Sequence, residues 1–173
     1  MIGFDHWAAT VSHFAQTGPG VNVDIGTTNG IFGGAVSAFL TTLVVGAIMV
    51  AVVPAYTERM MTVVLDDPIG SFAYGILSLL AIGFVAVVLI LTVIGILVAA
   101  PLLILAFLVW AIGAAIAYLA IADRLVGRED GWLKPLVVAA AINGILVVTA
   151  VGGLLSICIG AAGFGAVLRN YLE

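Results

Sequence analysis

Residues 69–122 read IGSFAYGILSLLAIGFVAVVLILTVIGILVAAPLLILAFLVWAIGAAIAYLAIA, a stretch of 54 residues that contains no charged side chain. A single helix of this length would be about 80 Å long, whereas the hydrocarbon core of a bilayer is about 30 Å thick. The stretch must therefore fold back on itself. The segment Thr92-Val93-Ile94-Gly95, shortly before Pro101, is the expected turn. We predict two membrane-spanning helices, over 69–92 and 97–122.

The composition of the whole chain agrees with a membrane protein. Hydrophobic residues make up 64% of the chain, charged residues make up 8%, and the mean hydropathy is +1.35. Soluble domains carry about 25% charged residues. The polar side chains are too few to cover a surface that faces water, so we expect a multi-pass protein of the cell membrane, with membrane lipids as partners.

The charges exclude one class of partner. The formal net charge is −4, with five Lys and Arg residues against nine Asp and Glu. A nucleic-acid-binding protein needs a basic patch, and this chain has none, so we expect no nucleic-acid partner. The acidic balance with a single Lys points to a salt-adapted, halophilic organism. Cys158 is the only cysteine, lies in an apolar run, and is expected to be a small packing residue.

Two further apolar runs complete the pattern. Residues 31–54 form an uncharged run of 24 residues, long enough to cross a bilayer. Residues 133–168 would make a helix of about 54 Å, which is too long for one crossing. Gly152-Gly153 lies near the middle of that run, so we predict two short helices, 134–150 and 154–169, each covering about 24 Å. They form either two spans or a re-entrant pair.

The distribution of positive charge predicts the orientation. Cytoplasmic loops carry an excess of Lys and Arg. With five spans, the loops 55–68 and 123–134 share one side with the C-terminal tail. All the cationic residues then lie on that side: Arg59, Arg124, Arg128, Lys134 and Arg169. We therefore predict an all-α, polytopic bundle of about five spans, with the N-terminus outside and the C-terminus in the cytoplasm.

The first thirty residues are expected to form a separate extracytoplasmic segment, so the chain divides into residues 1–30 and a bundle over 31–173. Apolar residues recur at helical spacing in the first fifteen residues, which predicts an amphipathic helix on the membrane surface rather than a signal peptide. His6 and His13 are seven residues apart, which matches no established zinc spacing, so we expect no metal site.

The first cytoplasmic loop is expected to hold a short helix at the membrane interface. Met60, Met61, Val64 and Leu65 supply its apolar side, while Glu58 and Arg59 face the headgroups. Asp67-Pro68 is typical of an N-cap residue followed by a first-turn proline, and it predicts the start of the next span.

The second cytoplasmic loop, Asp123 to Pro135, is the most charged stretch of the chain. One interpretation is a solvated turn with Trp132 as an aromatic anchor at the interface. The other is a docking site for a cytoplasmic partner, built from Arg124, Arg128, Glu129, Asp130 and Trp132.

The predicted spans contain no residue types that carry catalysis. No Asp, Glu, Lys, Arg or His lies in their interior, and no hydrolase, metalloprotease or nucleotide-binding motif is present. We therefore expect no enzyme activity, no catalytic residue and no cofactor. Asn143 is expected to hydrogen-bond a neighbouring helix. Alternatively Asn143, Thr92, Thr149 and Ser156 line a pore near the glycine breaks.

Two turns resemble each other in sequence. Residues 90–97 read ILTVIGIL and residues 147–154 read VVTAVGGL, each between two apolar helices. The two helix pairs run in the same sense, so the pattern indicates a parallel repeat, although similarity over eight positions also arises by chance.

The chain resembles the membrane domain that follows bactofilin-like, polymer-forming repeats in archaeal and bacterial proteins. The residues that carry this resemblance are Asp66-Asp67-Pro68-Ile69-Gly70-Ser71, LILTVIGILVAAPLLIL over 89–105, and GGLLSICIGAAGFGAVL over 152–168. The resemblance covers about residues 31–170 and implies a membrane anchor or scaffold without catalytic residues. Only thirty residues stand where the resemblance implies a β-helical polymer-forming region, so we do not expect this chain to form filaments and expect the membrane domain to be the functional part.

Three functions follow as hypotheses. The first is a non-catalytic membrane scaffold, anchor or accessory subunit that associates with itself or with another membrane protein. The second is an oligomeric channel or facilitator for a small solute or ion. The third is a structural membrane protein of an archaeal virus envelope.

Overall fold

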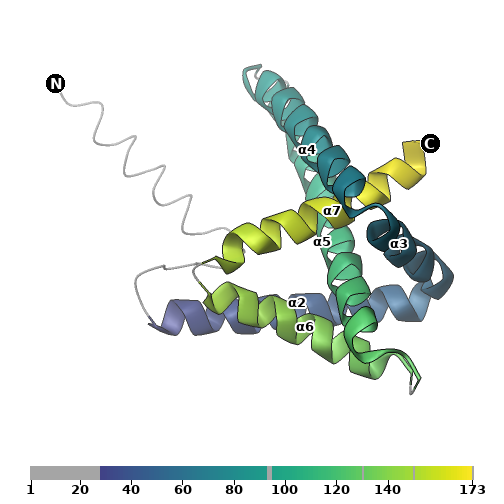
Figure 1. Cartoon of the computed structure of the whole chain (residues 1–173). Helices are drawn as coiled ribbons and strands as arrows, with labels where there is room; N and C mark the ends of the chain where they lie inside the picture. Colours follow the sequence, from purple (N-terminus) through teal and green to yellow (C-terminus); the bar gives the residue numbers. More distant parts are fainter. Residues whose placement is uncertain (1–27, 93–94, 130, 150, 173) are drawn as a thin grey trace.

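The structure is a computed structural model that describes residues 28–92, 95–129, 131–149 and 151–172. Every regular element in these ranges is an α-helix, which confirms the all-α bundle (Figure 1). The helices are α2 (Thr28–Val52), α3 (Pro54–Asp66), α4 (Pro68–Ile90), α5 (Gly95–Val126), α6 (Leu133–Val148) and α7 (Gly152–Leu172). The surface helix predicted near the N-terminus, with His6 and His13, lies outside the described residues.

Four of these helices are long and apolar enough to cross a membrane by length and composition: α2, α4, α5 and α7. The fifth apolar helix, α6, has 16 residues and is therefore about 24 Å long, shorter than a hydrocarbon core of about 30 Å. Helix α5 has 32 residues, about 48 Å, so it extends beyond the core at one or both ends unless it is strongly tilted. Five spans with a fixed orientation remain a prediction.

A helix boundary lies close to each predicted turn, although Gly152 and Gly153, expected in the second turn, begin α7. The Thr92 hydroxyl donates to the carbonyl of Leu89 over 2.9 Å, and the Thr149 hydroxyl donates to the carbonyl of Leu146 over 2.8 Å. Three residues after each threonine, a glycine amide returns to that threonine: Gly95 N to Thr92 Oγ1 (3.0 Å) and Gly152 N to Thr149 O (2.9 Å). The threonine hydroxyl bonds of the two segments are therefore alike, whereas the glycine amide bonds the side chain of Thr92 in one segment and the carbonyl of Thr149 in the other.

Ion pairs gather the charged segments at one end of the bundle. Arg128, beyond the end of α5, contacts Glu58 of α3 over 2.9 Å. Arg169, near the end of α7, contacts Asp67 between α3 and α4 over 3.0 Å. Both predicted cytoplasmic loops and the end of α7 therefore lie together, which is the arrangement from which the positive-inside rule derives its orientation.

Helix α7 packs tightly against both α4 and α5 through small residues. It crosses α5 where Gly163 meets Gly113, and it crosses α4 where Gly165 and Ala161 meet Gly75 and Ser71. A Cβ atom on any of these four glycines would meet the backbone of the opposite helix. Close backbone approach of this kind is a usual way of packing helices in lipid, where burial of apolar surface provides no driving force.

The other tight pair is α2 with α6, which run antiparallel. Gly34 near the start of α2 lies close to Val147 near the end of α6, whereas Gly46 lies close to Leu136 near the start of α6. In Figure 1 the two helices lie along the lower part of the bundle, while α4 and α5 extend together to a turn at the top of the view.

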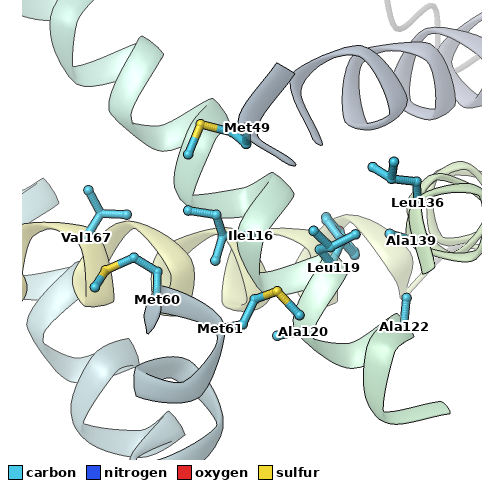
Figure 2. Packing of buried hydrophobic residues seen from close by; sticks show 11 residues of the cluster. Met49, Met60, Met61, Ile116, Leu119, Ala120, Ala122, Leu136, Ala139 and Val167 are labelled. Carbon is cyan, nitrogen blue, oxygen red and sulfur yellow. The ribbon is translucent and has the colours of Figure 1, made fainter. Parts of the chain in front are cut away.

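Helix α3 corrects one prediction. The helix is present, and Glu58 and Arg59 are exposed as expected. However, the apolar side, expected to face the lipid interface, is buried in protein: Met60 is 0% exposed and Met61 is 3% exposed. Figure 2 shows both methionines among residues of α5 and α7. Long apolar side chains gain more contacts in a packed core than at a headgroup boundary. Helix α3 therefore packs against the end of the bundle instead of lying in the lipid interface.

The second charged loop is shorter than predicted. Helix α5 continues to Val126, so Asp123 and Arg124 lie in its last turns rather than in the loop. Arg124 at this position interacts favourably with the negative end of the helix dipole.

Candidate functional site

A pocket with polar and apolar walls lies between α2, α5 and α6. Its volume is about 310 Å³. Helices α2 and α6 meet at one wall through Asn143, and α5 closes the other side. The lining residues are Gly34, Ser37, Ala38, Thr41, Thr42, Phe107, Trp110, Ala111, Ala114, Ala115, Asn143 and Val147.

Helical spacing in the sequence creates this space. Gly34, Ala38 and Thr41 follow one another at intervals of four and three residues, so they share a face of α2. Ala111, Ala114 and Ala115 form a similar small-residue face on α5. Where two faces of small side chains do not meet backbone to backbone, a space remains between them. The rings of Phe107 and Trp110 form its apolar part.

Asn143 joins α6 to α2 across the edge of the pocket. Its Nδ2 donates to Thr42 Oγ1 over 2.7 Å and makes a longer contact of 3.4 Å to the carbonyl of Ala38. The predicted hydrogen bond between Asn143 and a neighbouring helix is therefore confirmed. Thr42 is 5% exposed and Asn143 is half-buried, so the bond is partly shielded from the surroundings. A hydrogen bond of this kind between membrane helices stabilises the packed pair by about 0.6–2 kcal/mol.

The other residues predicted for a pore lie elsewhere. Thr92 and Thr149 are exposed in the two turns and bond to local backbone groups. Ser156 on α7 accepts a hydrogen bond of 3.0 Å from the hydroxyl of Tyr118 on α5. Within the described residues of one chain, the structure thus distributes Asn143, Thr92, Thr149 and Ser156 over separate places instead of aligning them along one path.

The residues predicted as a docking site are partly engaged within the chain. Arg128 contacts Glu58 over 2.9 Å and Asp123 over 2.9 Å, and its guanidinium lies 4.4 Å from the centroid of the Trp132 ring. These three contacts attach α3 to the segment between α5 and α6, so Arg128 has a structural role. Arg124 and Glu129 are exposed, and Asp130 lies outside the described residues.

A second charged cluster was not predicted as a site. Asp67 accepts hydrogen bonds from the Gly70 amide (2.9 Å) and from Arg169 (3.0 Å). The Gly70 bond, followed by the Arg169 bond, lowers the pKa of Asp67 below its usual value. A pocket of about 340 Å³ opens beside this pair, with Arg59, Asp66 and Asn170 in its wall. The N-cap was visible in the sequence, but the pairing of Asp67 with Arg169 joins residues 102 positions apart.

The described residues offer little to a metal ion. In the ranges that the structure covers, no group of three or more His, Cys, Asp or Glu side chains comes together. Tyr56 and Tyr171 lie near the charged end with ring centroids 6.4 Å apart, and burial raises the pKa of Tyr56 to about 12. Tyr56 is therefore not ionised at neutral pH, and the two rings form a packing contact.

Comparison with known proteins gives a family and no relative of established activity. No curated protein and no solved structure matches the sequence. A family model described as a domain of unknown function, DUF8173, matches residues 5–173. Because this match covers nearly the whole chain, from the segment before α2 to the end of α7, the protein belongs to the DUF8173 family.

Proposed function

We propose that this protein is a non-catalytic scaffold or accessory subunit of the membrane, and that it assembles with copies of itself through the far half of the α4–α5 hairpin. The observation that carries this proposal is Gly83 in that half, which has no atom within 4 Å of the position of its Cβ and lies among exposed apolar side chains. Of the described residues between Leu80 and Leu108, only Ala86, Gly95 and Ala99 are buried. Most of the large apolar side chains there are exposed, including Phe84 at 71% and Leu97 at 81% exposure.

A glycine on this hairpin supports association between chains. In the interior of the bundle, Gly75, Gly113, Gly163 and Gly165 each touch the backbone of another helix. Gly83 on α4 has nothing within 4 Å of the position of a Cβ atom. A glycine within a membrane helix is typical of close helix contacts, so a helix of a second copy is a suitable neighbour for Gly83.

The polar side chains that bond to other helices of the same chain also favour a structural role. Asn143 joins α6 to α2, Tyr118 joins α5 to α7, and Arg128 joins α3 to the end of α5. These contacts hold helices in place, and a rigid bundle that presents an apolar hairpin is what a membrane scaffold requires. The resemblance to membrane domains of polymer-forming proteins supports the same role. We place the N-terminus outside and the C-terminus in the cytoplasm.

Native mass spectrometry of the chain in lipid nanodiscs tests this proposal. We expect a homo-oligomer for the natural sequence and a shift toward monomer for Gly83→Leu, because a large side chain keeps the second helix away. Gly153→Leu is the matched control, since Gly153 also has open space beside it but lies in the first turn of α7, away from the hairpin. A natural chain that stays monomeric, or an oligomer that Gly83→Leu leaves intact, would contradict assembly through the hairpin. An oligomer with a central water-filled path would favour the channel instead.

A further inference from the structure

The carboxamide of Asn143 lines the pocket between α2, α5 and α6. The amide nitrogen of Asn143 bonds to Thr42 and Ala38, but its Oδ1 receives no hydrogen bond from any described residue. In the hydrocarbon region, an unsatisfied carbonyl costs several kcal/mol. We propose that this pocket binds a small, neutral, alcohol-type amphiphile whose hydroxyl group donates a hydrogen bond to Asn143 Oδ1.

The chemistry of the lining defines the polar end of the ligand. Because Asn143 Nδ2 is already engaged, the free group is an acceptor, and the ligand must supply a donor. The hydroxyls of Ser37 and Thr41 also line the pocket and can exchange hydrogen bonds with the same group. None of the lining residues is charged. A charged headgroup would therefore be desolvated without an opposite charge, which excludes anionic and cationic ligands on energetic grounds.

The remainder of the pocket determines the apolar end. Phe107 and Trp110 provide aromatic surface, while Ala111 and Ala114 leave space along α5. A volume of about 310 Å³ lies at the lower end of the range for small-molecule sites. The pocket therefore suits a hydroxyl with a short hydrocarbon segment beside it. This inference is independent of self-association, because the pocket lies within one chain and does not involve Gly83.

Trp110 allows the proposal to be tested by fluorescence. A chain that carries Trp7→Phe and Trp132→Phe keeps Trp110 as its only tryptophan. In nanodiscs, this chain is titrated with 6-bromohexan-1-ol and with 1-bromohexane, whose bromine quenches a nearby indole. We expect saturable quenching by both, with the alcohol binding about fivefold more tightly after correction for partition into the bilayer, as one neutral hydrogen bond provides.

Four variants distinguish ligand binding in the pocket from general effects on the packing of the helices. Asn143→Leu should abolish the preference for the alcohol, and Ala114→Leu should weaken both ligands by filling the pocket. Thr42→Val removes the bond between helices but keeps Asn143, so the preference should remain. Ala141→Leu changes the apolar groove on the opposite side of α6 and should have no effect.

Two results would overturn the proposal. The first is equal affinity of the natural pocket for the alcohol and the alkane, which would mean that no hydrogen bond to Asn143 favours the alcohol. The second is a preference for the alcohol that survives both Asn143→Leu and Ala114→Leu, which would place the alcohol elsewhere on the protein or on a second copy.

Discussion

Gly163 of α7 lies directly against the backbone carbonyl of Gly113 of α5, at the point where these two helices cross. A methyl group on Gly163 would overlap that carbonyl, and backbone cannot move aside as a flexible side chain can. We therefore expect Gly163→Ala to lower the free energy of unfolding by about 1–3 kcal/mol, the usual cost of overpacking.

Gly33→Ala is the matched control for this change. Gly33 lies on α2, and no atom lies within 4 Å of the position of its Cβ. Alanine has a higher helix propensity than glycine, so Gly33→Ala should be neutral or slightly stabilising. Unfolding in mixed micelles, followed by circular dichroism, measures both variants. Equal effects of the two substitutions would show that the crossing is looser than the structure indicates.

The bond between Asn143 and Thr42 should show energetic coupling between α6 and α2. Each of Asn143→Leu and Thr42→Val removes the 2.7 Å hydrogen bond, so the double variant should lose less stability than the sum of the two single losses. We expect a coupling free energy of about 0.6–2 kcal/mol. Thr41→Val serves as the control, because Thr41 is exposed and makes no bond to Asn143. If the stability losses of the two single variants simply add up in the double variant, the bond between Asn143 and Thr42 does not stabilise the protein.

Acid should weaken the attachment of α7 to the α3–α4 junction. The pKa of Asp67 is lowered in the folded chain by its bonds to Gly70 and Arg169. Its contribution to stability is therefore present above the unfolded value of about 3.9 and is lost as the pH falls through the lower folded value. Asp67→Asn retains an N-cap but removes the charge.

Melting temperatures of both chains from pH 7 to pH 3 in the same detergent measure this effect. The difference in melting temperature between the natural chain and Asp67→Asn should become smaller as the pH falls toward 3. A constant difference across this range would contradict the role given to the charge of Asp67.

Labelling of single cysteines decides whether α6 and α7 cross the membrane. In a Cys158→Ser background, Leu91→Cys lies at the α4–α5 turn, Val151→Cys lies at the α6–α7 turn, and Glu129→Cys lies at the charged end; all three positions are exposed. With a membrane-impermeant maleimide on intact cells, we expect labelling of the first two and protection of the third. Failure to label Val151→Cys while Leu91→Cys reacts would indicate a re-entrant pair.

Local patterns in the sequence were sufficient to predict the positions of several structural elements. The turns near Thr92 and Gly152, the N-cap at Asp67 and the helix α3 were predicted where they occur. Asn143 was singled out because a lone carboxamide in an apolar run must find a partner. Its partner Thr42 could not be predicted, since several hydroxyl groups on other helices were equally possible from the sequence.

The candidate site was harder to predict than the elements that build it. The pocket needs small residues of α2 opposite small residues of α5, and the sequence does not show which faces oppose one another. The same applies to Arg128, whose contacts with Glu58 and Trp132 depend on the position of α3. The sequence predicts α3 as a helix in the lipid interface, because the apolar side of α3 is equally compatible with lipid and with protein.

The sequence alone determined that this is an all-helical membrane protein, where its helices turn, and at which end its charges gather. These properties depend on local hydrophobicity, on glycine positions and on the thickness of a bilayer, all of which are read along the chain. The tertiary structure decided which glycines meet, which apolar sides are buried, and where a polar pocket remains. In a membrane the lipid-facing and protein-facing sides of a helix are both apolar, so only the packing of the helices distinguishes them.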